Sequence, residues 1–223
     1  MNWDESKACT PIKRDFLRAW FEVDQRFFLT GGSALGLFYL HHRISYDLDL
    51  FTTCEVEAIE VRNLVIRVAN TIGAECQAIR SAPDFNRFRL TRAEERELID
   101  VVVDRAPQLD SQKADFEGIK VDTIREIIAN KLTTLISRTE LKDVVDLYFL
   151  QHAGHDLLAA IPDAKQKDGG WEPAVVSMLL DGLKITEVPG WVVADLTQAE
   201  LQAFLERLRL SIASLALPNQ PSE

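Results

Sequence analysis

The sequence of 223 residues has few cysteines, no long apolar run and no excess of basic side chains. Its three cysteines, Cys9, Cys54 and Cys76, are odd in number and lack metal-ligand spacing, which favours reduced thiols. No window of about 18 apolar residues occurs, so we expect no membrane-spanning helix. The first residues show neither a basic nor an apolar region of a secretory signal. These absences together predict a cytoplasmic protein that does not act at a membrane.

The formal net charge of −10 argues against a broad surface for nucleic acids, which is normally basic. It leaves room for contact with a short RNA end, because local basic clusters occur. In one of them Arg87 and Arg89 alternate on an expected strand, with Arg92 following. Phe88 and Leu90 would face the other side of that strand, which leaves the two arginines on an open face. Solvated surface charge is the default interpretation of this cluster, and contact with RNA is the alternative.

The spacing of apolar residues along the chain predicts strands and helices up to about residue 122, and only helices from Thr123 onward. The chain is 47% hydrophobic, enough for one substantial core and a smaller helical one. The expected strands are 27–30, 47–52, 74–80, 86–92, 97–104 and 118–121. The expected helices are 11–23, 33–42, 55–72, 123–138, 140–151, 155–161, 172–184 and 197–214. A loop is expected from Pro162 to Trp171. The expected domains are 1–122 and 123–223, with one continuous unit as the alternative.

A Gly-Gly-Ser turn follows the first expected strand. Gly31 and Gly32 can adopt positive φ and let a ligand approach the main chain. Successive N–H groups that lead into a helix form an anion-binding cradle. Ser33 is placed either to cap that helix or to donate a hydrogen bond to a phosphate. The turn alone is equally typical of a plain strand-to-helix connection.

Two carboxylates lie on the next expected strand, at Asp47 and Asp49. Side chains two apart on a strand share a face, and their Cα atoms lie about 6.6 Å apart. Two such carboxylates can bind one small hard cation, and placing them together without one costs stability. A phosphate cradle and metal-binding carboxylates within one short segment are typical of enzymes that act on nucleoside triphosphates.

This segment resembles the signature of the nucleotidyltransferase superfamily that includes DNA polymerase beta. Gly-Gly-Ser-Ala-Leu from Gly31, followed by Arg-x-Ser-x-Asp-Leu-Asp-Leu-Phe from Arg43, is similar to the AbiEii/AbiGii toxin branch. The resemblance covers roughly residues 20–150. It implies an α+β fold: a minimal nucleotidyltransferase core, with a mixed sheet flanked by helices, followed by a C-terminal helical region. It also implies a toxin of a bacterial toxin–antitoxin or abortive-infection pair.

A third carboxylate is implied by the resemblance, on a strand beside the first two. The candidates are Asp100 and Asp104, which share one face of the expected strand 97–104 but lie about 13 Å apart. They are therefore too far apart to serve one metal ion. The family pattern assigns the ligand to Asp100, and Asp104 is then a surface or capping residue.

A lysine lies on the apolar stripe of the expected helix 123–138. Lys131 either extends its amine past the helix edge or reaches a polar cleft. The resemblance implies the second role, in which Lys131 binds the triphosphate. Arg138, Asp143 and Asp146 form a charge cluster near a helix junction, and structural ion pairs are at least as plausible for them as catalysis.

The resemblance implies transfer of a nucleoside monophosphate from a triphosphate to an acceptor hydroxyl. Its metal is Mg²⁺ or Mn²⁺, its phosphate cradle is Gly31, Gly32 and Ser33, and its catalytic ligands are Asp47, Asp49 and Asp100. Asp100 would join a second metal or act as the base. Arg43 and Ser45 are candidates for nucleotide contacts, although Arg43 could equally pair with Asp47. The acceptor stays open among a tRNA end, another RNA, a protein hydroxyl and a small molecule, and the antitoxin would be a separate protein. The alternative is a catalytically silent nucleotide-binding or regulatory module that acts through a partner protein.

Overall fold

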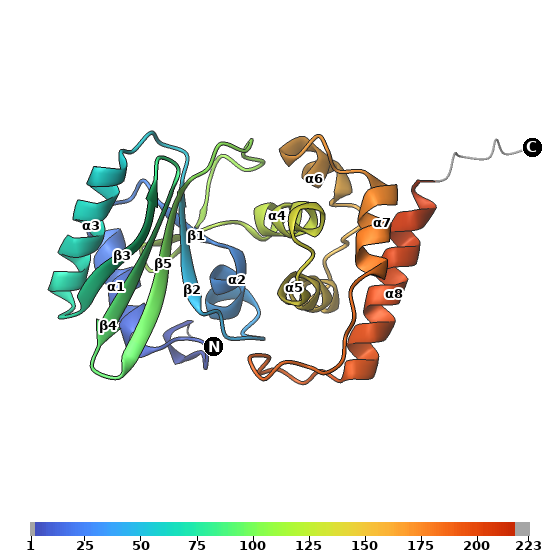
Figure 1. The fold of residues 1–223 in the computed structure, drawn as a ribbon, viewed down its shortest axis with the longest axis horizontal. Coiled ribbons are helices and arrows are strands. Elements are labelled where there is room, and N and C mark those ends of the chain that lie inside the picture. Colours follow the sequence, from blue (N-terminus) through green and yellow to red (C-terminus); the bar gives the residue numbers. More distant parts are fainter. Residues whose placement is uncertain (1–2, 217–223) are drawn as a thin grey trace, which may run out of the picture. The chain divides into compact units, whose positions relative to one another are not determined.

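A computed structural model describes residues 3–216 (Figure 1). Its chain forms two compact units. The first holds the described residues up to Arg105 together with Asp110–Thr123, and the second holds Ala106–Leu109 and the described residues from Ile124. The predicted division into domains 1–122 and 123–223 stays a prediction, because two compact units in the structure do not show that either part folds on its own. None of the helices within residues 3–216 combines the length and the apolar character needed to cross a bilayer.

The first unit is built on a seven-stranded mixed sheet. In chain order its elements are η1 (Trp3–Glu5), α1 (Pro11–Val23), β1 (Phe28–Thr30), α2 (Gly31–Ala34), the π-helical η2 (Leu35–Tyr39), β2 (Asp47–Thr52), α3 (Ala58–Thr71), β3 (Glu75–Ala82), β4 (Phe85–Arg92), β5 (Glu95–Val103), β6 (Ala114–Phe116) and β7 (Ile119–Val121). The strand order is β3-β4-β5-β2-β1-β7-β6. β2 runs parallel to β5 and β1 parallel to β7, and the other neighbours are antiparallel.

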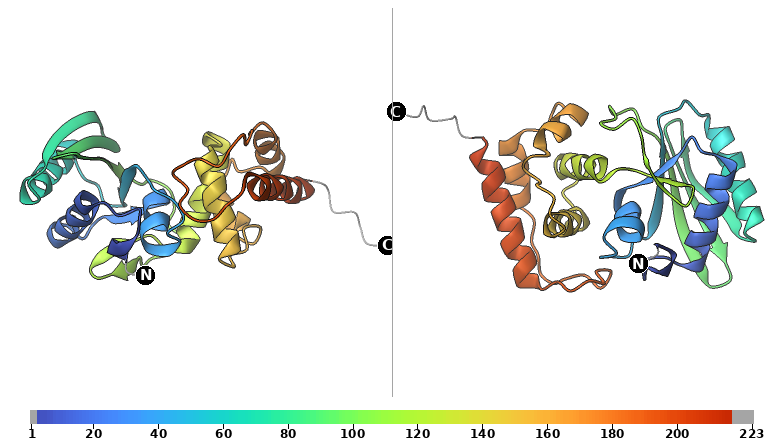
Figure 2. Two further views of the ribbon diagram at one scale, coloured as in Figure 1. Left: turned by 90° about the horizontal axis from the view of Figure 1, so that it is seen from below. Right: turned by 180° about the vertical axis from the view of Figure 1, so that it is seen from behind.

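Helices α1 and α3 cover one face of this sheet, as Figures 1 and 2 show. α1 begins cleanly because the Thr10 side chain accepts a hydrogen bond from the Lys13 backbone N–H and Pro11 occupies the first turn. Phe16 and Trp20 of α1 are fully buried, together with Phe88 of β4 and Ile99 of β5. This apolar layer fixes which face of each strand turns inward and which turns away from the helices.

The second unit consists of α4 (Ile124–Ser137), α5 (Leu141–His152), α6 (Ile161–Lys167), α7 (Pro173–Asp181) and α8 (Gln198–Ser214). Its core contains the fully buried Trp171, whose indole N–H donates to the Leu132 carbonyl at 2.9 Å. α8 begins with a reciprocal capping box between Thr197 and Glu200. A mixed sheet with flanking helices, followed by helices, confirms the α+β fold class that the sequence predicts.

Three elements differ from the sequence prediction. The helix expected over 155–161 instead spans Ile161–Lys167, inside the expected loop, because Pro162 lies in the first turn, where a proline is tolerated. The helix expected from Ser33 already begins at Gly31 and changes to a π-helical turn at Leu35. The short strand β6 was not predicted, and it exists as the antiparallel partner of β7.

Candidate metal and nucleotide site

Strand β2 carries the first two predicted site residues on one face. Along Asp47–Thr52 the buried residues alternate with half-buried ones, and Leu48 and Leu50 turn into the core. Asp47 and Asp49 therefore share the face that turns away from the apolar layer. The alternation follows from the two-residue period of a strand in the middle of the sheet.

The parallel neighbour β5 brings the third carboxylate to this face. Asp100 pairs in register with Asp49, and each of the three aspartates has a carboxylate oxygen within 4.8 Å of those of the other two. Asp104 lies past the end of β5, where its backbone N–H donates to the Thr52 carbonyl at 2.7 Å. The structure thus gathers Asp47, Asp49 and Asp100, which we call the acidic triad, and does not bring Asp104 into it.

The acidic triad fits a small hard cation. All its donors are carboxylate oxygens, which Mg²⁺ and Mn²⁺ prefer over the softer metals. Three like charges at this separation raise one another's energy, and a bound cation relieves that repulsion. The donor set and the spacing therefore match the predicted metal ligands Asp47, Asp49 and Asp100.

Arg87, which the sequence places on an open face near the cleft that the resemblance implies, contacts the acidic triad directly. Arg87 of β4 pairs in register with Asp100 and donates to both of its oxygens, from Nε at 2.7 Å and from Nη2 at 2.5 Å. The hydrogen bond to Asp100, with the nearby charges of Asp100, Asp47 and Asp49, raises the pKa of Arg87. Asp100 itself is only 4% exposed. The antiparallel register of β4 and β5 is the signal that could have revealed this pair.

The Gly-Gly-Ser turn lies close to the acidic triad. Gly31 has a φ of +65°, and a Cβ atom there would lie 2.7 Å from Asp49 Oδ2. Ser33 accepts a hydrogen bond from the Asp49 backbone N–H at 3.4 Å, which ties the turn to β2. The other aspartate of β2 is contacted by Ser45, whose Oγ donates to Asp47 Oδ1 at 3.1 Å. The predicted residues Gly31, Ser33 and Ser45 thus lie beside the acidic triad.

The buried Arg43 explains why residue 32 is a glycine. A Cβ atom on Gly32 would lie 1.9 Å from Nη2 of Arg43, so the guanidinium covers the Gly32 main chain. Nη1 of Arg43 also donates to the Ile44 carbonyl at 3.2 Å. The Arg43 side chain therefore lies against the Gly31–Ser33 turn, where it can add positive charge beside the backbone N–H groups.

Two buried polar networks support the site and were missed in the sequence. In the first, Asp122 accepts hydrogen bonds from Thr30 Oγ1 and from Lys113 Nζ, both at 2.7 Å, directly before Gly31. In the second, Lys13 Nζ donates to the Ser45 carbonyl at 2.5 Å and pairs with Glu97 at 3.4 Å. The Lys13–Ser45 and Thr30–Asp122 partners are 32 and 92 residues apart in the chain, so no local pattern predicts them.

Lys131 is buried within the second unit. Its Nζ lies 2.7 Å from Asp143 Oδ1 and 2.6 Å from Asp146 Oδ2, and Arg138 Nε approaches Asp143 Oδ2 at 3.1 Å. Lys131 is 4% exposed, so the alternative in which its amine extends past the helix edge is wrong. The ion pairs expected for Arg138, Asp143 and Asp146 are present. A contact of Lys131 with the triphosphate stays a prediction.

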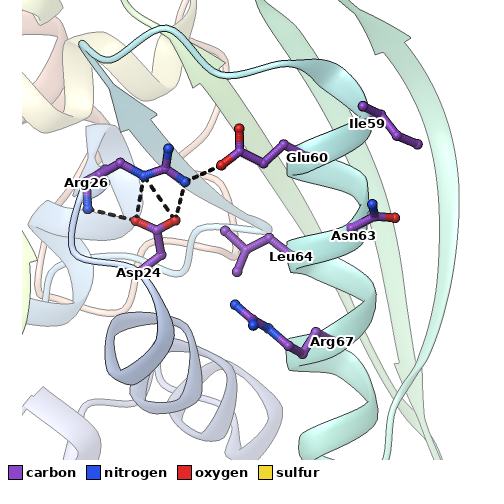
Figure 3. A pocket seen from close by; sticks show the side chains of 7 residues that line it. All are labelled: Asp24, Arg26, Ile59, Glu60, Asn63, Leu64 and Arg67. Carbon is purple, nitrogen blue, oxygen red and sulfur yellow. Dashed lines mark hydrogen bonds and ion pairs between the residues drawn. The ribbon is translucent and has the colours of Figure 1, made fainter.

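A separate cavity of about 420 Å³ in the first unit holds none of the predicted site residues (Figure 3). It lies between the segment Asp24–Arg26, just after α1, and the side of α3 that faces this segment. Arg26, which lines it, donates to both Asp24 and Glu60, the latter at 2.5 Å. Two acidic and two basic side chains line the cavity in Figure 3, namely Asp24, Glu60, Arg26 and Arg67. Their charges compensate one another, so the lining favours neither an anionic nor a cationic ligand.

Comparison with known proteins supports the resemblance seen in the sequence. The family model for nucleotidyl transferase AbiEii toxins of type IV toxin–antitoxin systems matches residues 15–216. A Helicobacter pylori protein assigned to the nucleotidyltransferases has a similar structure, with a TM-score of 0.61 and 21% identity over 91% of this chain and 94% of that one. JHP933 from Helicobacter pylori is similar at a TM-score of 0.60 and 22% identity, over 91% of each chain. No curated protein matches the sequence.

Proposed function

This chain belongs to the nucleotidyl transferase AbiEii toxin family of type IV toxin–antitoxin systems, and from that premise we propose a metal-dependent nucleotidyl transfer to RNA. The family implies a nucleotide substrate and an antitoxin as partner. The observation that carries the proposal is the register of β2 and β5, which pairs Asp49 with Asp100 beside the Gly31 turn. The predominantly reduced cysteines expected from the sequence are in keeping with a reaction in the cytoplasm.

Asp47, Asp49 and Asp100 are the residues that would hold Mg²⁺ or Mn²⁺. The bound cation would supply charge neutralisation for the triphosphate. Both oxygens of Asp100 already accept hydrogen bonds from Arg87, and we therefore favour a ligand role for Asp100 over that of a base. Ser45 would orient Asp47 through its hydroxyl.

The Gly31–Ser33 turn is the proposed cradle for the outer phosphates. Gly31 and Gly32 carry no side chain that would block the main-chain N–H groups, and the Arg43 guanidinium behind Gly32 adds positive charge. From the family motif we also propose that Lys131 binds the triphosphate. The weakening of nucleotide binding in Lys131→Met, by about tenfold or more, would support that role.

In the proposed reaction the acceptor hydroxyl oxygen forms a bond to the α-phosphorus. The bond between that phosphorus and the oxygen bridging to the β-phosphate breaks, and pyrophosphate leaves with the bonding electrons. The hydroxyl proton passes to solvent. The residues of the chain contribute by holding the two reactants in line and by compensating negative charge.

The deciding experiment uses the protein with Mg²⁺, total cellular RNA or total protein, and each nucleoside triphosphate labelled at its α-phosphate. We expect label in RNA with one preferred nucleotide. Label in protein would overturn the RNA acceptor while leaving nucleotidyl transfer in place. Binding of a nucleotide with no transfer to either fraction would instead indicate the silent, partner-dependent module.

A further inference from the structure

One face of strands β3, β4 and β5 turns away from α1 and α3. On β4 the residues Phe88 and Leu90 are buried beneath α3, whereas Arg87 and Arg89 lie on the opposite face. β3 is the edge strand of the sheet, and nearly all its residues are exposed. The open face predicted for Arg87 and Arg89 therefore exists, and it continues onto β3.

The strand register aligns this face with the acidic triad. Arg80 of β3 is opposite Arg87, Arg87 is opposite Asp100, and Asp100 is opposite Asp49. At a strand spacing of about 4.8 Å, Arg80 lies about 14 Å across the sheet from Asp49. Arg89 is in the next row, where Nη1 donates to Gln77 Oε1 at 3.2 Å. A basic row thus leads across the sheet to the proposed metal ligands.

Two of these arginines, Arg80 and Arg89, are exposed without an acidic partner in the described part of the chain. Within residues 3–216, no carboxylate lies within ion-pair distance of either guanidinium. Arg92, which the sequence grouped with Arg87 and Arg89, does pair, with Asp15 at 2.8 Å and with Glu95 at 3.1 Å. The cluster on this face is therefore Arg80, Arg87 and Arg89, of which Arg80 and Arg89 carry charge that no carboxylate described by the structure compensates.

Phe85 organises two of the arginines. The guanidinium carbon of Arg80 lies 5.3 Å from the centre of the Phe85 ring, and that of Arg87 lies 5.6 Å from it. Attraction between each cation and the ring restrains the two long side chains before any ligand arrives. Such restraint lowers the entropy cost of binding, because fewer rotamers remain to be frozen. We call Arg80, Phe85, Arg87 and Arg89 the arginine face.

The position of the arginine face separates it from the proposed triphosphate cradle. The Gly31 turn follows β1, which flanks β2 on one side, while β5, β4 and β3 follow on the other side. The donor nucleotide and the arginine face therefore approach the acidic triad from opposite sides of β2. The arginine face is on the side left for the acceptor, and guanidinium groups bind phosphate oxygens in pairs.

We propose that the arginine face binds the phosphates of a single-stranded RNA acceptor and leads its terminal hydroxyl to Asp47, Asp49 and Asp100. This inference rests on the proposed nucleotidyl transfer and adds the surface by which the acceptor is held. Arg80 and Arg89 bind the RNA backbone, and Arg87 links the backbone site to Asp100.

The test measures binding of a short, fluorescently labelled single-stranded RNA to the protein without nucleotide or metal. The double variant Arg80→Gln/Arg89→Gln should bind the RNA about tenfold to a hundredfold more weakly. The slope of log affinity against log salt should fall by about 1.4, because each phosphate of a single strand that an arginine neutralises contributes about 0.7. In the transfer reaction the same variant should raise KM for RNA much more than it lowers kcat.

The matched control is Arg62→Gln/Arg67→Gln on α3, which covers the other face of the sheet. Both arginines are exposed, and Arg67 lines the cavity of Figure 3, so the control removes the same charge elsewhere. It should keep RNA affinity within about twofold. Equal loss of affinity in the two double variants would overturn the proposal, because net charge alone would then explain binding.

The remaining outcomes separate this proposal from the proposed function. Unchanged RNA binding by Arg80→Gln/Arg89→Gln overturns the arginine face, even where labelled nucleotide is still transferred. Poly-glutamate that displaces the labelled RNA as well as unlabelled RNA does would also overturn the proposal, because the face would then bind any acidic polymer and not RNA phosphates in particular. RNA binding that depends on Arg80 and Arg89 without any transfer supports the arginine face and overturns the transfer itself.

Discussion

The two units each gather carboxylates around a cation, but they expose them differently. In the first unit Asp47 and Asp49 are half-buried and Arg87 contacts the nearly buried Asp100 from an open face. In the second unit Asp143 and Asp146 are 0% exposed, and the amine of Lys131, a residue that is 4% exposed, pairs with both of them. Buried partners hold a structure together, whereas carboxylates that reach solvent can exchange partners for a ligand. The carboxylates of the first unit are thus open to a ligand, whereas those of the second unit are held by buried ion pairs.

The largest expected effect comes from Asp49→Ala. Removal of one of three carboxylates should lower nucleotidyl transfer about a thousandfold, since the charge neutralisation of a bound metal contributes several kcal/mol. The free energy of unfolding should stay unchanged or rise in metal-free buffer, because repulsion from Asp47 and Asp100 is relieved. Transfer assays and urea unfolding measure the two effects. Normal transfer, or a protein that fails to fold, would contradict the metal site.

The same substitution in the other cluster, Asp143→Ala, should act on stability. It leaves Lys131 without one of its buried partners, and breaking a buried pair in this way costs about 3–5 kcal/mol. Urea unfolding measures this cost directly. Lys131→Met keeps the packing of the side-chain stem, but it removes the amine from its two buried carboxylate partners, so we expect it to destabilise the protein as well. A similar unfolding free energy for Asp49→Ala and Asp143→Ala would remove the distinction between the clusters.

Arg87→Gln should tighten metal binding. Removal of the guanidinium frees both oxygens of Asp100 and takes one positive charge away from Asp47 and Asp49, so Mn²⁺ affinity should rise about tenfold. Titration calorimetry without nucleotide or RNA measures it. Arg89→Gln, two residues along the same strand, makes the same charge change at an arginine that binds Gln77, and it should leave the affinity within about twofold. Weaker Mn²⁺ binding in Arg87→Gln would show that Arg87 orients Asp100 instead of competing with the metal.

Gly31→Ala should destabilise the protein less than Asp143→Ala does. Its positive φ and the approach to Asp49 Oδ2 each disfavour a Cβ atom, and together they should cost about 1–2 kcal/mol. Because the strain falls on Asp49, Mn²⁺ affinity should fall as well. Gly73→Ala is the control, with nearly the same positive φ but no atom within 4 Å of its Cβ position. An equal drop in metal affinity in both variants would mean that backbone strain alone, and not the approach to Asp49, matters.

Local patterns predicted the parts of this site that depend on neighbouring residues. The alternation of Asp47 and Asp49 with Leu48 and Leu50 fixed their shared face, because the strand period is local. The contact of Arg87 with Asp100 depends on the register of two strands, which no single segment determines.

Longer-range and terminal features were harder to predict. The Thr30–Asp122 hydrogen bond joins residues 92 apart, so sequence spacing gives no sign of it. The sequence predicts a helix that ends before Pro162, whereas α6 begins at Ile161. A proline in the first turn is compatible with the start of a helix, so Pro162 alone does not distinguish the two cases. The choice of Asp100 over Asp104 came from the family resemblance, since both share one face of the strand.

Ala106–Leu109 belongs to the second unit although the residues on both sides of it belong to the first, which determines what a chain cleaved in this segment would contain. A break within this segment leaves β1 to β5, with all three triad carboxylates, on one fragment. β7, the parallel neighbour of β1, falls on the other fragment together with β6 and helices α4 to α8. Each fragment alone therefore lacks strands of the seven-stranded sheet, and that sheet is complete only when both fragments are present.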